Sequence, residues 1–224
     1  MNLQEKVNLT REIFERVLCF AHHKHVYVAW TGGKDSTVTL SLWASFLEEK
    51  GYNSKPGAIN LDTGLKFPEI IKFRDDLVEK WNVHLYVAEP DIETEEYPVA
   101  RNKVSCCRDL KVDPLKRAIT DLRVQGLITG IRKDEHHTRK DREQIEKKQD
   151  PAYFQINPIL HWTVMDIWSF IVQQGLPYCK LYDQGYTSLG CMPCTTRPTC
   201  DAERSGRDME KEANLEVLRS LGYF

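Results

Sequence analysis

A glycine-containing loop near the N-terminus has the composition of an anion-binding site. It follows a short apolar run at 25–29 and leads into a segment with helical spacing of large apolar side chains. Paired glycines let backbone N–H groups approach an anion, and a helix N-terminus adds partial positive charge. The loop therefore predicts a phosphate or sulfate site, although an ordinary turn capped by Asp35 or Ser36 has the same composition. The residues of the loop are Thr31, Gly32, Gly33, Lys34, Asp35 and Ser36.

Cysteines are the second group with distinctive chemistry. The chain has seven of them, an odd number, which argues against a disulfide framework and for metal or redox chemistry. Cys106 and Cys107 are adjacent, whereas Cys191 and Cys194 form a C-x-x-C pair. Adjacent thiolates chelate a single small ion poorly, but each can reach a different iron of a 4Fe-4S cluster. This arrangement favours a cluster over a structural zinc ion.

Polar residues also follow two of the predicted strands. Asp62 and Thr63 end one of them, and Arg132 and Arg139 follow another. Ligands of an open parallel sheet lie beyond the carboxyl ends of its strands, so these side chains are expected beside the glycine loop. Because arginine pairs with polyanions through two parallel hydrogen bonds, the pattern predicts counter-charges for a bound polyanion.

The spacing of apolar residues predicts the elements that position these groups. Helical and strand-like segments alternate, which indicates an α/β fold with a doubly wound parallel sheet. We expect one domain over residues 1–224, with a cluster-binding tail from about 178 to 224. The acidic run 89–97 is expected to be a surface loop, and the charged run 140–150 an exposed helix or a mobile loop. The expected helices are at about 8–23, 36–50, 68–81, 115–122 and 164–174, and the expected strands at 25–29, 58–61, 83–88, 126–130 and 154–159.

Composition sets limits on partners. The net charge of -2 offers no overall attraction for nucleic acid, and no apolar run approaches the roughly 20 residues that span a bilayer. The N-terminal residues lack the pattern of a secretory signal, so a cytoplasmic protein that binds neither nucleic acid nor membrane is expected.

The loop and the cysteines together resemble a known family. The loop is similar to the SGGKDS loop of the ATP pyrophosphatase (PP-loop) superfamily, with Thr31 in place of the first serine. Three further segments resemble the iron–sulfur sulfonucleotide reductases of that superfamily: Cys106-Cys107-x-x-x-Lys111, Gly185–Thr195 and Glu203–Arg207. These reductases act on adenosine 5′-phosphosulfate (APS) or 3′-phosphoadenosine 5′-phosphosulfate (PAPS).

The resemblance implies a role for each group. Arg132 and Arg139 match the family's G-x-R-R-x-x-x-x-R segment, and with Arg204 and Arg207 they would lie near the phosphosulfate, beside the loop. Lys111 would lie between the substrate and the cluster. In this family a cysteine near the C-terminus attacks the sulfur, and a thioredoxin-like reductant then releases sulfite in sulfate assimilation. The implied ligands of the 4Fe-4S cluster are Cys106, Cys107, Cys191 and Cys194.

The sequence departs from the family pattern at the attacking residue. The reductases carry a Glu-Cys-Gly-Leu-His segment, but no cysteine follows Arg207 here. Cys200 is therefore the candidate nucleophile, and Cys179 is a weaker candidate. Lys133 also stands where the family has a second arginine.

Other features resemble ATP-cleaving relatives. The segments 62–69 and 221–224 are similar to the small subunit of bacterial ATP sulfurylase. An enzyme of that type, or a thiolation enzyme that adenylates its substrate, is the alternative function, with Asp35 and Asp62 organising Mg²⁺ around ATP. A non-catalytic nucleotide and redox sensor is a third hypothesis. The sequence leaves open the choice among APS, PAPS and ATP, the electron donor, and whether the chain forms a homo-oligomer.

Overall fold

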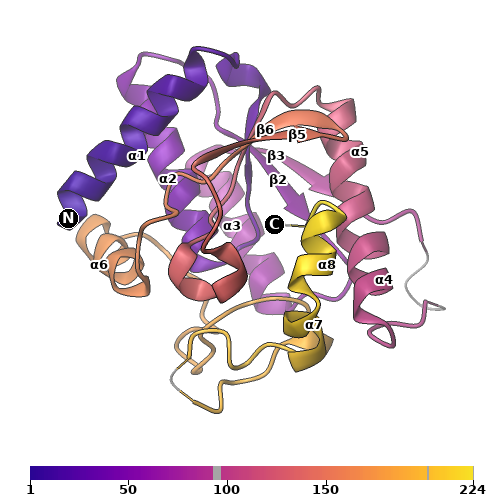
Figure 1. The fold of residues 1–224 in the computed structure, drawn as a ribbon. Helices are drawn as coiled ribbons and strands as arrows, with labels where there is room; N and C mark the ends of the chain where they lie inside the picture. Colours follow the sequence, from indigo (N-terminus) through magenta and orange to yellow (C-terminus); the bar gives the residue numbers. More distant parts are fainter. Residues whose placement is uncertain (93–96, 201, 224) are drawn as a thin grey trace.

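A six-stranded sheet forms the centre of the protein (Figure 1). The computed structural model describes residues 1–92, 97–200 and 202–223. The strand order is β3-β2-β1-β4-β6-β5, and every pairing is parallel except that of β5 with β6. The chain winds in both directions from β1, which confirms the predicted doubly wound α/β fold. The strands are β1 (Val26–Ala29), β2 (Gly57–Leu61), β3 (His84–Ala88), β4 (Gly126–Ile128), β5 (Ile145–Gln149) and β6 (Ala152–Ile156).

Helices cover both faces of this sheet. Alternate residues of a strand point to opposite faces, so Val26 and Val28 pack with α1, α2, α3 and α6, while Tyr27 and Ala29 pack with α5. In Figure 1, α1, α2 and α6 lie to the left of the sheet, and α4 and α5 lie to its right. The helices are α1 (Leu3–Leu18), α2 (Lys34–Glu49), α3 (Pro68–Trp81), α4 (Lys103–Cys107), α5 (Asp113–Asp121), α6 (Val164–Gln174), α7 (Met209–Ala213) and α8 (Leu215–Ser220).

The charged run 140–150 differs from its prediction. It contains the edge strand β5, so the expectation of an exposed helix or mobile loop was wrong. The strand has no apolar alternation, because backbone pairing with β6 holds it and charged side chains suit an exposed sheet edge. Of the acidic run 89–97, residues 93–96 lie outside the described residues.

Both ends of α6 lie where the capping residues in the sequence predicted them. The side chain of Thr163 accepts a hydrogen bond from the backbone N–H of Asp166, whose carboxylate accepts one in return. Gly175 ends the helix in the left-handed region, with φ 60°. Both ends were predicted from the residue types at these positions, since the capping hydrogen bonds are local to the helix.

The chain after α6 passes over the carboxyl ends of the strands. Its backbone pairs with the segment after β2 through Lys66 and Cys191, and it pairs with itself through Thr195 and Arg207. Two short helices, α7 and α8, then lie beside α4 (Figure 1). In the described parts of the chain, no helix has the length and apolar character that crossing a membrane requires.

Candidate active site

A pocket of about 160 Å³ opens where the carboxyl ends of β1, β2 and β4 meet the C-terminal tail. Ala29 and Leu61 end β1 and β2, and both line it together with Gly130, which follows β4. The opposite wall comes from the tail, including Tyr182, residues 188–191 and Arg207. This is the edge of the sheet where the strand order reverses and where ligands of such sheets bind.

The glycine loop forms one wall of the pocket through Thr31, Gly33, Asp35 and Ser36. The Ser36 hydroxyl accepts a hydrogen bond from the N–H of Thr31 (3.2 Å) and donates one to the carbonyl of Gly33 (3.0 Å). Gly32 has φ +81°, and a Cβ there would lie 2.9 Å from Cγ2 of Ile70, so only glycine fits. The loop therefore has both the turn bonds of the alternative prediction and a position facing the pocket.

The N-terminus of α2 is capped by a residue from the tail. The backbone N–H of Lys34 donates to the hydroxyl of Tyr182 at 2.9 Å, and no side chain of the loop caps the helix. Burial raises the pKa of Tyr182 to about 12, so the phenol stays neutral. Tyr182 was not predicted, since no local pattern links a tail tyrosine to a loop 148 residues earlier in the chain.

A network of buried charges lies beneath the loop. The Arg132 side chain is 0% exposed and donates to Asp35 (2.7 Å), to Asp134 (2.5 Å) and to Glu203. Lys34, 2% exposed, pairs with Asp35 at 2.9 Å and also with Glu203. Burial alone would raise the pKa of Asp35, but Lys34 and Arg132 hold it below its ordinary value. Neither Lys34 nor Arg132 lines the pocket. Both pair with Asp35 of the loop and with Glu203 of the tail, so they hold the loop and the tail together.

The other three predicted arginines do line the pocket. Arg139 pairs with Glu135, and Arg204 makes two hydrogen bonds to Glu212, at 2.7 and 2.8 Å. Arg207 instead donates to uncharged oxygens, including the Ser188 hydroxyl at 2.9 Å.

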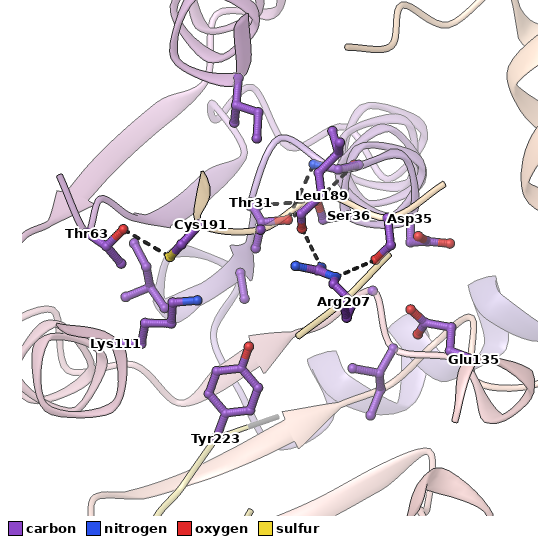
Figure 2. Close-up of a pocket in the computed structure, with 18 of the residues that line it drawn as sticks. Thr31, Asp35, Ser36, Thr63, Lys111, Glu135, Leu189, Cys191, Arg207 and Tyr223 are labelled. Atoms are coloured by element: carbon purple, nitrogen blue, oxygen red, sulfur yellow. Dashed lines mark hydrogen bonds between the residues drawn. The ribbon is translucent and has the colours of Figure 1, made fainter. Parts of the chain in front are cut away.

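Arg207 is the guanidinium best placed to meet a ligand. Within the described parts of the chain it has no carboxylate at ion-pair distance. Burial and the charge of Arg204 lower its pKa, so an anion would relieve an unfavourable environment. In Figure 2, Arg207 lies between Cys191 and Lys111 on one side and Asp35 and Glu135 on the other.

The four predicted cluster ligands line one small cavity next to the pocket. Cys106 and Cys107 lie in α4 and at its end, and Cys191 and Cys194 flank a short turn of the tail. Zinc with four thiolates at about 2.3 Å needs sulfur atoms about 3.8 Å apart. Among the described residues, no three of these sulfur atoms lie within 4.8 Å of one another. This spacing does not suit a single ion held by three or more of these thiolates.

Lys111 joins the two cavities. A π-helical turn, Arg108–Val112, follows α4 directly, and such turns often occur at functional sites. Its Lys111 lines both the pocket and the cysteine cavity. Burial would raise the pKa of Cys191, but Lys111 and a 3.3 Å hydrogen bond with Thr63 lower it to about 7. The ammonium group therefore favours a thiolate at Cys191 (Figure 2).

Besides Lys34 and Arg132, three more of the residues predicted to bind the substrate or to catalyse lie away from the pocket lining. Asp62 pairs with Arg74 at 2.9 Å, and Gly32 faces Ile70. Cys200 is exposed, in the tail segment before Glu203. The acidic groups proposed for Mg²⁺ are thus already paired with bases.

Lys66 and Tyr223, like Tyr182, line the pocket and were not predicted from the sequence. Lys66 follows the Asp62-Thr63-Gly64 turn, and burial, with Lys111 nearby, lowers its pKa to about 8 against the opposing effect of Asp62. Tyr223 comes from the end of the described chain; burial would raise its pKa, but Lys211 and Lys111 lower it to about 8. The available signal for Lys66 was its place just after a strand end that was itself predicted to face the site.

Replacing Gly130 with alanine is expected to destabilise the protein by about 1–3 kcal/mol, as overpacking does. The added Cβ would lie 2.8 Å from the backbone nitrogen of Ser36, which cannot move without moving the loop. Urea unfolding measures the change. Gly51→Asn is the control, because Gly51 has φ +76° and open space around it, and asparagine tolerates that conformation. Equal midpoints for Gly130→Ala and the unaltered protein would contradict the close approach.

The chain is similar to known sulfonucleotide reductases. The phosphoadenosine phosphosulfate reductase domain matches residues 25–197. The chain is 36% identical over 165 residues to adenosine 5′-phosphosulfate reductase of Geobacillus sp. (strain WCH70), covering 68% of this chain and 69% of that protein. It is 33% identical over 193 residues to adenosine 5′-phosphosulfate reductase 2 of Bacillus subtilis (strain 168), covering 82% and 78%.

A solved structure agrees on the fold. Phosphoadenylyl-sulfate (PAPS) reductase from Candida auris, in a phosphate complex, superposes with a TM-score of 0.70 at 21% identity, covering 84% of this chain and 90% of that one. The domain match and the relatives thus point to the same family as the glycine loop, and the solved structure shares the fold that carries the pocket. The chain therefore belongs to the phosphoadenosine phosphosulfate reductase domain family, the sulfonucleotide reductases of the PP-loop superfamily.

Proposed function

We propose that the protein is a thiol-dependent sulfonucleotide reductase that binds APS or PAPS, holds a 4Fe-4S cluster and releases sulfite. One observation carries this proposal: Lys111 lines both the pocket at the carboxyl ends of the strands and the cavity of four cysteines. A pocket for an adenylated sulfate and a site for a cluster thus share one cation. The relatives named as APS reductases support the same activity.

The chain's own residues can bind the substrate by charge. The loop residues Thr31 and Ser36 lie on one wall of the pocket, and Thr31 offers a hydroxyl donor to a phosphate, whereas the Ser36 hydroxyl donates to Gly33. Arg207 offers a guanidinium that no described carboxylate neutralises, and it lies between the loop side and the cysteine side. Because charge-assisted hydrogen bonds are stronger than neutral ones, this arrangement orients the phosphosulfate along the pocket.

The residues present fit a cluster. Cys106, Cys107, Cys191 and Cys194, which line one cavity, would hold it, and no three of their sulfur atoms lie as close together as a single ion requires. When bound, a cluster supplies a compact inorganic charge centre beside the sulfate end of the pocket. Lys111 would lie between that centre and the substrate, where its ammonium group can stabilise negative charge on the sulfate oxygens.

The attacking thiol is proposed to be Cys200. Its thiolate would form a bond to the sulfate sulfur while the bond from that sulfur to the bridging phosphate oxygen breaks. The nucleotide leaves with the electron pair. One thiolate of a thioredoxin-like dithiol then attacks Sγ of Cys200, and sulfite leaves with the electron pair of the S–S bond. The second thiol of the reductant attacks the first sulfur of the reductant in this mixed disulfide, so that Cys200 leaves as a thiolate and the reductant, now a disulfide, has lost two protons in all.

The anchoring of the tail supports this assignment. Glu203, three residues after Cys200, is bound by Lys34 and Arg132 beneath the loop, and Arg204 and Arg207 line the pocket. Cys200 therefore lies only three residues before Glu203, which its ion pairs hold next to the glycine loop. No described cysteine follows it in the chain.

A substrate panel tests the proposal. Sulfite release is expected from APS or PAPS with a dithiol reductant, and Cys200→Ser is expected to abolish it while Cys19→Ser, at another exposed cysteine, leaves it unchanged. Full activity of Cys200→Ser would show that the nucleophile is a thiol elsewhere. Pyrophosphate release from ATP in the presence of sulfate, without sulfite from either sulfonucleotide, would favour the adenylyl-transferring alternative and overturn the reductase.

A further inference from the structure

Lys66 places a second ammonium group at the cysteine end of the pocket. Its backbone pairs with that of Cys191, and the N–H of Met192 donates to the carbonyl of Leu65 at 2.8 Å. The segment after β2 is therefore joined to the cysteine-bearing tail. The side chain of Lys66 lines the pocket and does not line the cysteine cavity, whereas Lys111 lines both.

A hydrogen bond to buried Asn60 holds the ammonium group of Lys66 in position. Nζ of Lys66 donates to Oδ1 of Asn60 at 3.0 Å. Asn60 is 0% exposed, and its amide nitrogen donates to the carbonyl of Trp30 at 2.7 Å, which orients its oxygen toward Lys66. An ammonium group has three donors, and among the described residues only Asn60 accepts from Lys66, so two donors remain for a ligand.

The charges around this group call for an anion. Lys66 and Lys111 repel each other electrostatically. In the part of the chain that the structure describes, neither has a carboxylate within 4.0 Å, and the neighbouring acid Asp62 is paired with Arg74. The Cys191 thiolate interacts favourably with both ammonium groups, and an anion in the pocket that both lysines line would add further negative charge to offset their repulsion.

We propose that Lys66 and Lys111 form an oxyanion subsite for the sulfate group of the sulfonucleotide and for the sulfite product, with Lys66 as the residue that distinguishes sulfated nucleotides from AMP. This inference rests on the proposed function. Lys66 lines the pocket but not the cysteine cavity, whereas Lys111 lines both, so the two lysines have different roles. The phosphate of the nucleotide, at the glycine loop, would not contact Lys66.

Binding measurements on the cluster-loaded full chain test the subsite. Titration calorimetry of Lys66→Met with APS or PAPS, whichever the unaltered protein binds, should show an affinity lower by about 10- to 100-fold, the loss of a charge-assisted hydrogen bond. AMP should bind within about threefold of the unaltered protein. Sulfite, as a competing ligand, should weaken in parallel with the sulfonucleotide, and Lys66→Arg should restore most of the affinity.

Controls separate this role from a structural one. Lys55→Met removes an exposed lysine outside the pocket lining and should change nothing. Iron content and thermal midpoint should be the same in Lys66→Met and in the unaltered protein. Equal losses of affinity for AMP and the sulfonucleotide, or no loss for either, would overturn the subsite. If the unaltered protein binds neither APS nor PAPS more tightly than AMP, the proposed function itself fails, and the subsite with it.

Discussion

Replacing Arg132 with methionine is expected to lower the free energy of unfolding by about 3–5 kcal/mol. The guanidinium is fully buried and binds Asp35, Asp134 and Glu203. Methionine fills similar space but leaves two half-buried carboxylates with only Lys34 to neutralise them. The large effect arises because breaking a buried ion pair leaves an uncompensated charge, which costs far more than the intact pair contributes.

Urea unfolding of the two proteins measures this effect. The control is Arg117→Met, which removes a pair with Asp91 in which the two side chains are 40% and 79% exposed. Surface pairs of this kind contribute about 0–1 kcal/mol. A loss of similar size in both variants would show that Arg132 does not hold the loop and the tail together.

The effect of Arg132 should depend on pH in one direction. Lys34 and Arg132 outweigh burial and lower the pKa of Asp35 below its ordinary value of 3.8 in the folded protein. A lowered carboxyl pKa contributes stability above the unfolded pKa, and that stability is lost as the pH falls through the folded pKa. The difference in unfolding free energy between the unaltered protein and Arg132→Met should therefore be full at pH 7 and shrink below about pH 4.

If the chain has the proposed cluster and activity, replacing Cys191 with serine is expected to prevent cluster binding and to lower sulfite formation by at least about 100-fold. Serine keeps the size of the side chain but offers no thiolate, and Cys191 is the thiol whose pKa Lys111 and Thr63 lower to about 7 against the effect of burial. The variant should be colourless and bind little iron. Iron assay and absorbance near 400 nm, where iron–sulfur proteins are coloured, check the first part, and sulfite release checks the second.

Cys179→Ala is the matched control for this experiment. Cys179 is also buried, but it packs with Ile70 and Leu181 in an apolar cluster and does not line the cysteine cavity. Its loss should leave iron content and sulfite release unchanged, at a modest loss of stability. Unchanged iron binding in Cys191→Ser would contradict the four-cysteine assignment.

Local residue patterns predicted much of the fold. The helix between Thr163 and Gly175, and the strands that end before Thr31 and Asp62, depend on periodicity and on capping residues nearby in the chain. Strand β5 was missed, because its pairing with β6 rather than its own apolar pattern holds it. Helices α7 and α8 were also not predicted, since five- and six-residue helices give little periodicity to detect.

The sequence by itself determined the chemistry available to this protein: a glycine loop for an anion, a set of cysteines, and a group of basic side chains. Tertiary structure alone decided which basic side chains face the pocket. Lys34 and Arg132 are committed to Glu203, 169 and 71 residues further along the chain, while Arg207 and Lys66 face the pocket. The physical reason is that a cation's role depends on whether a buried carboxylate neutralises it, and that partner comes from the distant tail.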